Sequence, residues 1–96
     1  MRALLCEALG PVAYSLHVRD VPDLHASSGQ LVIDVKAASV NFPDLLMVQG
    51  LYQMKPPLPF SPGGEVAGVV REVGAGVSGF RAGQRVMAFC GFGGFI

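Results

Sequence analysis

Glycine and proline interrupt this chain at such short intervals that no long helix can form in it. The 96 residues include 13 glycines and 7 prolines, and either residue weakens the interior of a helix or a strand. Between these interruptions the apolar residues recur with period two, as in strands, rather than with period 3.6, as in helices. The sequence therefore predicts a mainly β fold built from short strands.

The period-two segments predict where the strands lie. We expect strands at 2–7, 14–19, 30–40, 65–73 and 84–90. The segment 30–40 is the clearest, because Leu31, Ile33, Val35 and Ala37 alternate with Val32, Asp34 and Lys36. In 14–19 the residues Tyr14, Leu16 and Val18 would share one face of a hairpin partner for 2–7. We expect six short strands in all, of which these five can be placed, with one small helix, an arrangement typical of an irregular barrel or sandwich.

The period changes at Asn41, where a short helix is expected. Asn41 is a candidate N-cap, Pro43 suits the first turn, Asp44 is an acid beside it, and Gly50 would end the helix. A rigid extended loop should follow, because four prolines stand close together at Pro56, Pro57, Pro59 and Pro62.

Length and charge exclude several classes of protein. The chain is long enough for one core only, and its 51% apolar and 15% charged residues are typical of a folding sequence. Seven basic residues balance seven acidic ones, which argues against a nucleic-acid partner. Glu7 interrupts what would be the apolar part of a signal peptide, and no run approaches the roughly 18 apolar residues of a membrane helix. We expect a cytoplasmic protein without a membrane partner.

Two further features concern the ends of the chain. Cys6 and Cys90 are its only cysteines, and we expect two free thiols rather than a disulfide. The last ten residues are apolar up to Ile96, whereas domain ends are usually polar. This pattern predicts a domain truncated at its C-terminal side.

The run 74–79, GAGVSG, matches the dinucleotide-binding pattern G-x-G-x-x-G. That site needs a helix to begin at the third glycine and an acid about 20 residues later. Neither is expected here, because a second turn follows at Gly83 and no acid occurs after Glu72. We interpret the run as a glycine turn between two strands.

A candidate functional site lies in the run 40–44, VNFPD, at the junction of a strand and a helix. The neutral amide of Asn41 can both donate and accept hydrogen bonds at the rim of a pocket. On residue types alone a structural interpretation also fits, in which Asn41 caps the helix and Asp44 complements its dipole.

An ordered set of motifs covers almost the whole chain and is much more specific than any one of them. It includes 2–4 (RAL), Asn41, Asp44, 49–52 (QGLY), Pro59, 62–68 (PGGEVAG), 73–77 (VGAGV), Phe80, Gly83 and 85–86 (RV). This set resembles the N-terminal domain of the medium-chain dehydrogenase/reductase superfamily, specifically its zinc-free, zeta-crystallin-like quinone oxidoreductase branch. The resemblance implies a GroES-like fold, with residues 1–96 as a partial catalytic, substrate-side domain and the Rossmann cofactor domain absent from this chain.

The resemblance also implies a reaction without zinc. Zinc-dependent members carry a Cys where this chain has Asn41, and a Gly-His-Glu where it has Gly63, Gly64 and Glu65. Both catalytic ligands are thus missing, and His17 and His25 lie in other segments, so no metal site is expected. Quinones and conjugated enones suit such a site, because hydride addition gives an oxyanion spread by resonance.

Carried over residue by residue, the resemblance gives the site its roles. Asn41, Phe42 and Asp44 would contact NADPH at its nicotinamide end, and Asn41 and Tyr52 would contact the substrate. Tyr52 would be catalytic, with its hydroxyl donating to a carbonyl oxygen; it could instead be an aromatic that braces the proline loop.

These points predict the N-terminal part of an NADPH-dependent quinone or enone oxidoreductase. The full-length protein would be a homodimer by family pattern, and the 96 residues alone would be inactive, since nothing in them is expected to hold the adenosine diphosphate half of the cofactor. Two alternatives remain: a stand-alone GroES-like association module, and the enoyl reductase domain of a polyketide or fatty-acid synthase. The polar pair Asn41 and Tyr52 argues for the enzyme.

Overall fold

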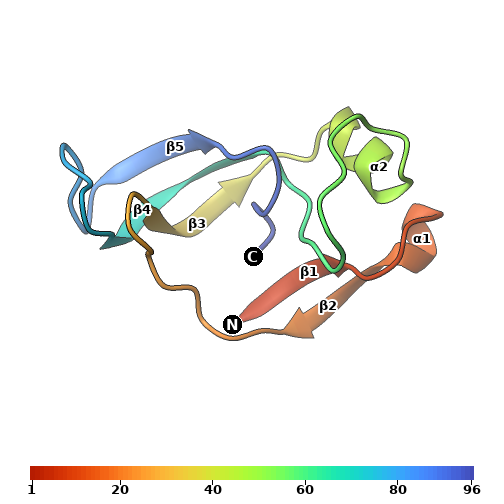
Figure 1. Ribbon diagram of the computed structural model, residues 1–96, viewed down its shortest axis with the longest axis horizontal. Coiled ribbons are helices and arrows are strands. Elements are labelled where there is room, and N and C mark those ends of the chain that lie inside the picture. Colours follow the sequence, from red (N-terminus) through yellow and green to blue (C-terminus); the bar gives the residue numbers. More distant parts are fainter.

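Two small antiparallel sheets and two short helices make up the computed structural model, which describes residues 1–96 (Figure 1). The elements in chain order are β1 (Arg2–Cys6), α1 (Val12–Ser15), β2 (Leu16–Asp20), β3 (Leu31–Ala38), α2 (Phe42–Val48), β4 (Glu65–Val73) and β5 (Arg85–Phe89). Strands β1 and β2 form one sheet, and β3, β4 and β5 form the other in that order. The expected mainly β, GroES-like fold is confirmed, with five strands rather than six and a second helix.

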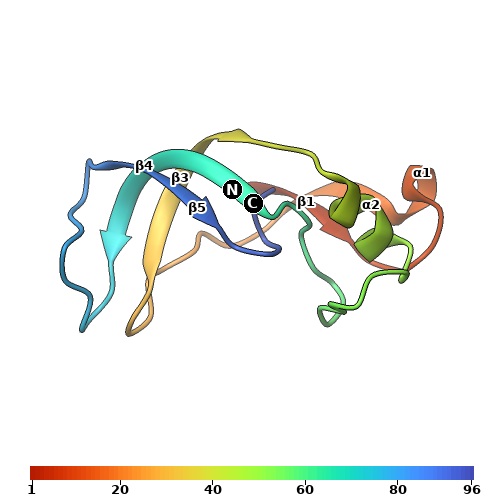
Figure 2. The same ribbon diagram turned by 90° about the horizontal axis from the view of Figure 1, so that it is seen from above.

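The three-stranded sheet is strongly curved because β3 and β4 each carry one irregularity, at Lys36 and at Arg71. The register between β3 and β4 shifts between Val32 and Ile33 and again between Val35 and Ala37, and such bulges bend a strand. Figure 2 shows the resulting arc of β4. The alternation expected for 30–40 is not seen: Val32, which was grouped with Asp34 and Lys36, is the buried residue of this strand.

The β1–β2 sheet differs from its prediction at one end. Tyr14 and Ser15 were expected in the second strand, but they belong to the helical turn α1, and β2 begins at Leu16. Ser15 turns its hydroxyl back to the carbonyl of Pro11 over 2.9 Å, a local bond that favours a turn over a strand. Tyr14 is consequently 80% exposed rather than aligned with Leu16.

The glycine run 74–79 forms the turn between β4 and β5, as predicted, and no helix begins there. A Cβ atom at Gly74 would lie 2.0 Å from the backbone oxygen of Ser27, so only glycine fits. This turn lies at the end of the sheet far from α2 (Figure 1).

The core cluster joins β1, the helix α2 and the proline-rich loop. Cys6, Met47, Val48 and Phe60 form one buried cluster. Cys6 and Phe60 also exchange two backbone hydrogen bonds, of 2.7 and 3.1 Å, which attach the proline-rich loop to β1. Both cysteines are free thiols. The longer of the two helices has seven residues, and neither is long and apolar enough to cross a membrane.

Candidate functional site

Asn41 stands where the chain leaves β3 and enters α2. Its backbone is extended, with φ −126° and ψ 162°, and its backbone N–H donates to the Asp44 carboxylate over 2.9 Å. Pro43 occupies the first turn, as expected for a residue without an N–H to satisfy. Asn41 and Asp44 thus form a capping box at the start of α2, as the structural interpretation of the sequence predicted.

Asp44 holds two segments together. Its side chain is 4% exposed, and its second oxygen accepts the backbone N–H of Gly63 over 3.1 Å. Gly63 lies in the loop before β4 and has φ +98°, a conformation that favours glycine. Because both carboxylate oxygens are engaged by backbone donors, Asp44 shapes the site by fixing the position of its neighbours.

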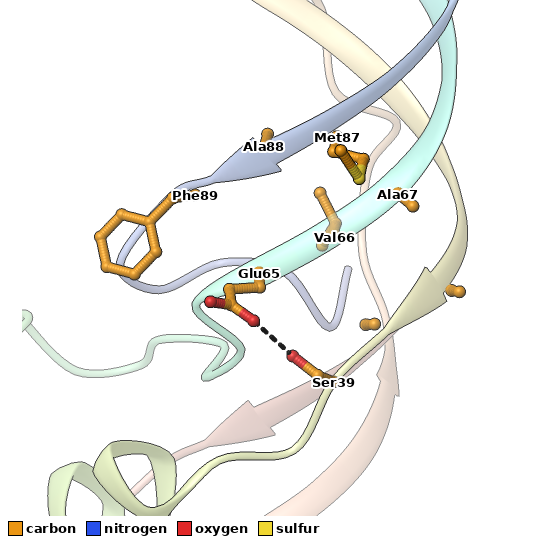
Figure 3. A pocket seen from close by; sticks show the side chains of 9 residues that line it. Ser39, Glu65, Val66, Ala67, Met87, Ala88 and Phe89 are labelled. Carbon is orange, nitrogen blue, oxygen red and sulfur yellow. Dashed lines mark hydrogen bonds between the residues drawn. The ribbon is translucent and has the colours of Figure 1, made fainter.

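The side chain of Asn41 belongs to a hydrogen-bonded chain of three residues. Its Nδ2 donates to Ser39 Oγ over 2.8 Å. The Ser39 hydroxyl in turn donates to Glu65 Oε2 over 3.1 Å, the bond drawn in Figure 3. The chain links the end of β3, the start of α2 and the first residue of β4.

Tyr52 approaches the same region from the proline-rich loop. The residue is half-buried and packs against the cluster of Cys6, Met47, Val48 and Phe60. It also lines a pocket together with Asn41. Tyr52 thus packs against the core beside the proline-rich loop and also forms part of the pocket wall, while its catalytic role stays a prediction.

This pocket, of about 310 Å³, collects most of the residues predicted from the sequence. Its lining is Asn41, Pro43, Asp44, Tyr52, Met54, Gly64, Glu65, Phe89 and Gly91. Phe42 does not line it: the side chain is 69% exposed on the first turn of α2. An amide, a phenol and two carboxylates therefore meet beside an aromatic ring in one hollow.

A second hollow, of about 620 Å³, lies along β3, β4 and β5 at the end of the sheet where Ser39, Glu65 and Phe89 stand (Figure 3). Its lining is Ala37, Ala38, Ser39, Glu65, Val66, Ala67, Met87, Ala88 and Phe89. Glu65 and Phe89 line both hollows, and apart from Glu65 and Ser39 the larger one is apolar. The smaller pocket has the groups that can orient a polar ligand, so we take it as the candidate site.

Cys90 follows the pocket residue Phe89. Burial raises the pKa of its thiol, and the nearby Asp44 carboxylate adds to the effect. Its Sγ points to the carbonyl oxygens of Gly63 and Gly64, at 3.5 and 3.4 Å. Nowhere in residues 1–96 do three or more His, Cys, Asp or Glu side chains gather as metal ligands would.

Sequence reasoning did not single out Ser39 or Phe89. Ser39 could have been found, because residues two apart in an extended segment point to the same side, and Ser39 precedes Asn41 by two. Phe89 could not, since its place beside the pocket depends on the pairing of Glu65 with Phe89 in the sheet.

Comparison with known proteins decides the family. The alcohol dehydrogenase GroES-like domain family matches residues 27–95. The chain belongs to this family. Its relatives place the GroES-like domain in the quinone oxidoreductase branch of the medium-chain dehydrogenase/reductase superfamily, which confirms the resemblance found in the sequence.

Two curated relatives illustrate the similarity. The domain is 40% identical over 94 residues to a quinone oxidoreductase-like protein 2 homolog of Nematostella vectensis, covering 97% of this chain and 25% of that protein. It is 56% identical over 59 residues to the human synaptic vesicle membrane protein VAT-1 homolog, covering 62% of this chain and 15% of that protein. The GroES-like domain thus spans a quarter or less of the length of these relatives.

Solved structures show the same fold. A probable oxidoreductase from Mycobacterium abscessus superposes with a TM-score of 0.87 at 47% identity, over 99% of this chain and 30% of that one. An Escherichia coli quinone oxidoreductase in complex with NADPH gives a TM-score of 0.81 at 31% identity, over 91% and 26% of the two chains. The GroES-like domain therefore has its structural counterparts among oxidoreductases.

Proposed function

We propose that this domain is the N-terminal, substrate-side part of a longer NADPH-dependent oxidoreductase that reduces quinones or conjugated enones. The observation that carries the proposal is the meeting of Asn41 and Tyr52 in one pocket of about 310 Å³. Quinone oxidoreductases among the relatives and an NADPH complex among the similar structures support the same reaction class.

The donors and acceptors of the pocket fit the nicotinamide end of the cofactor. A carboxamide both donates and accepts hydrogen bonds, and the Asn41 amide offers the same pair of functions in return. Asp44, already bound to two backbone N–H groups, would act by holding Asn41 and Gly63 in place. Phe42, exposed at the start of α2, would contact the cofactor from outside the pocket. Bound NADPH would supply the hydride.

The chain's own residues would meet the charge that develops on the substrate. The phenol of Tyr52 can donate a hydrogen bond to a carbonyl oxygen as it gains electrons. A zinc ion performs this task in the metal-dependent members, whereas here Asn41 and Gly64 stand at the positions of two of its ligands. We propose that hydrogen-bond donors and the resonance of the substrate replace the metal. Addition of a chelator should then leave activity unchanged.

The test uses the full-length protein and follows the oxidation of NADPH by 1,4-benzoquinone. Asn41→Ala and Tyr52→Phe should each lower kcat/KM about 5- to 30-fold, the effect of about 1–2 kcal/mol of lost hydrogen bonding. Ser28→Ala, in the loop before β3 where Ser28 bonds to Ala75, serves as the control. A protein that oxidises no NADPH with benzoquinone or with cyclohexenone would refute the proposal. Preference for an enoyl thioester over both would favour the synthase-type enoyl reductase.

One observation favours a second candidate, an association module. Met87 is 88% exposed and Phe89 82%, and both line the apolar hollow along β3, β4 and β5. An apolar surface of this kind often marks a protein interface. Sedimentation of the full-length protein and of Met87→Glu distinguishes the two: an inactive protein whose assembly depends on Met87 would support the module instead of the enzyme.

A further inference from the structure

In the Asn41–Ser39–Glu65 chain of hydrogen bonds, the chemistry of the three side chains determines which atom donates and which accepts in each bond. A carboxylate without its proton can only accept hydrogen bonds, whereas a hydroxyl has one proton to give and lone pairs to accept with. Because Ser39 gives its proton to Glu65 Oε2 at 3.1 Å, its oxygen can only accept from the Asn41 amide at 2.8 Å. The atom of Asn41 next to Ser39 must then be Nδ2, an assignment that follows from the network itself.

This order of donors and acceptors directs the amide oxygen away from Ser39. Asn41 and Asp44 form a capping box, in which Oδ1 faces the backbone N–H of Asp44. The second lone pair of Oδ1 is the acceptor that Asn41 brings to the pocket that it lines. If Ser39 were absent, only the capping contact would hold the amide, and its two ends, which have nearly the same shape, could exchange more often by rotation about the last side-chain bond.

Ser39 is not needed to form the helix or its cap. The backbone N–H of Asn41 is held by Asp44 at 2.9 Å, and Asp44 is held in turn by Gly63. The side-chain bonds of Ser39 and Glu65 lie at the exposed end of the sheet. The backbone N–H of Ser39 already donates to the Glu65 carbonyl over 3.3 Å, so the serine hydroxyl is not needed to join the two strands there. The effect of the side-chain bonds should therefore be found in ligand binding rather than in folding.

We infer that Ser39 is a positioning residue: it relays the negative charge of Glu65 to Asn41 and so fixes the Asn41 amide with its oxygen as the acceptor for the N–H of a bound nicotinamide carboxamide. The inference rests on the proposed function, since it names the orientation of a residue assigned to the same site. It adds two residues that act through Asn41: Ser39, which does not line the candidate pocket, and Glu65, which does.

The experiment compares Ser39→Ala, Ser39→Thr, Asn41→Ala and the double variant Ser39→Ala/Asn41→Ala in the full-length protein. NADPH dissociation constants come from titration followed by fluorescence, and Tm from thermal unfolding. A second readout without cofactor is the side-chain amide signal of Asn41 in a ¹H–¹⁵N spectrum, assigned by its loss in Asn41→Ala. Ser28→Ala is again the control.

We expect Ser39→Ala to weaken NADPH binding about three- to tenfold, as for one lost hydrogen bond, and to shift the Asn41 amide signal. Ser39→Thr should restore both, because it keeps the hydroxyl, and Tm should match the control throughout. The double variant should bind no more weakly than Asn41→Ala, since the serine acts only through the asparagine.

Two results would overturn the inference while the proposed function stands: additive losses in the double variant, or an Asn41 signal that Ser39→Ala does not move. A different result identifies a failure of the proposed function. If Asn41→Ala itself leaves NADPH binding unchanged, the assignment of Asn41 to the cofactor is wrong, and the role of Ser39 falls with it.

Discussion

The carboxylate of Asp44, in the first turn of α2, accepts the backbone N–H of Gly63 from the loop before β4 over 3.1 Å. Nineteen positions of sequence separate the two residues. The bond sets the distance between the helix that carries Asn41 and the strand that begins at Glu65. The width of the candidate site therefore depends on a buried acid that makes no direct contact with a ligand in our proposal.

Replacing Asp44 by Asn should destabilise the protein. The carboxylate accepts two N–H groups, from Asn41 and Gly63, whereas an Asn offers one acceptor and turns an NH₂ group toward the other donor. A buried N–H left without a partner costs about 1–3 kcal/mol, and each kcal/mol lowers Tm by about 4–8 °C in a domain of this size. Thermal unfolding measures the change.

The control for this variant is Asp20→Asn, at an exposed position on β2. It changes the charge in the same way without disturbing a buried bond, so its Tm should stay near that of the unmodified protein. Equal Tm values for the two variants would contradict the structural role of Asp44.

The sequence predicted the type and place of most elements because each depends on local chemistry. Alternation gave strands, and Asn41, Pro43 and Gly50 marked the helix α2. Where a contact between residues far apart in the sequence determines the local structure, the prediction was wrong or incomplete. The bulges at Arg71 of β4 and Lys36 of β3 depend on how the two strands pair, and the buried residue of β3 is Val32 rather than Leu31 or Ile33.

The candidate site shows the same difference between features that depend on local sequence and features that depend on distant contacts. Asn41, Asp44 and Tyr52 could be named from motifs, and all three line one pocket. Motifs could not reveal that both oxygens of Asp44 are already occupied, since Gly63 reaches it only in the folded chain. Nor could they show that Phe42 is 69% exposed and does not line the pocket, although it lies next to Asn41 in the sequence.

Protonation of the Glu72 carboxylate should lower the stability of the folded protein in acid. Its carboxylate accepts the N–H of Ala26 at 3.1 Å and pairs with His25 at 3.2 Å, and the Ala26 bond is the main cause of a pKa held below the usual 4.5. A group with a lowered folded-state pKa stabilises the native state above the unfolded pKa and loses that contribution as pH falls through the folded one. The loss should therefore begin near pH 4.5 and continue below it.

Urea unfolding of Glu72→Gln at a series of pH values tests this. The amide keeps an oxygen for Ala26 but does not titrate, so the variant should be less stable than the unmodified protein above pH 4.5 and should approach it in acid. Asp20→Asn is the control and should run parallel to the unmodified protein. A constant gap between Glu72→Gln and the unmodified protein at all pH values would contradict the linkage.

The two cysteines should differ in reactivity. Cys6 is fully buried in the core cluster, whereas Cys90 is exposed and has a pKa raised above 9.0, first by partial burial and then by Asp44. Thiolate is the reactive form, so Cys90 should react with iodoacetamide more slowly than free cysteine at pH 7.5, and the rate should still be rising above pH 9.0. Cys6 should react only after unfolding.

Mass spectrometry of partially labelled protein separates the two sites. Asp44→Asn removes the negative charge that raises the pKa of Cys90, so Cys90 should be labelled faster in this variant than in the unmodified protein. The labelling rate of Cys6 in urea, where both thiols are exposed, serves as the reference for both proteins. Labelling of Cys6 before Cys90 in the folded protein would show that the core cluster is not closed.

Phe89 should matter for ligand binding and not for folding. Its ring lines both the candidate site and the apolar hollow over the sheet while the side chain is 82% exposed. Truncating a side chain that packs little changes stability by about 0.5 kcal/mol or less, whereas a planar quinone would lose an aromatic surface to stack on. Phe89→Ala in the full-length protein should therefore raise KM for 1,4-benzoquinone about threefold to tenfold, for about 0.5–1.5 kcal/mol of lost contact.

Tyr14→Ala is the matched control, because Tyr14 is 80% exposed on α1 and lines neither hollow. The outcome that refutes the assignment is a fall in Tm with KM unchanged, since Phe89 would then support the fold and not the site.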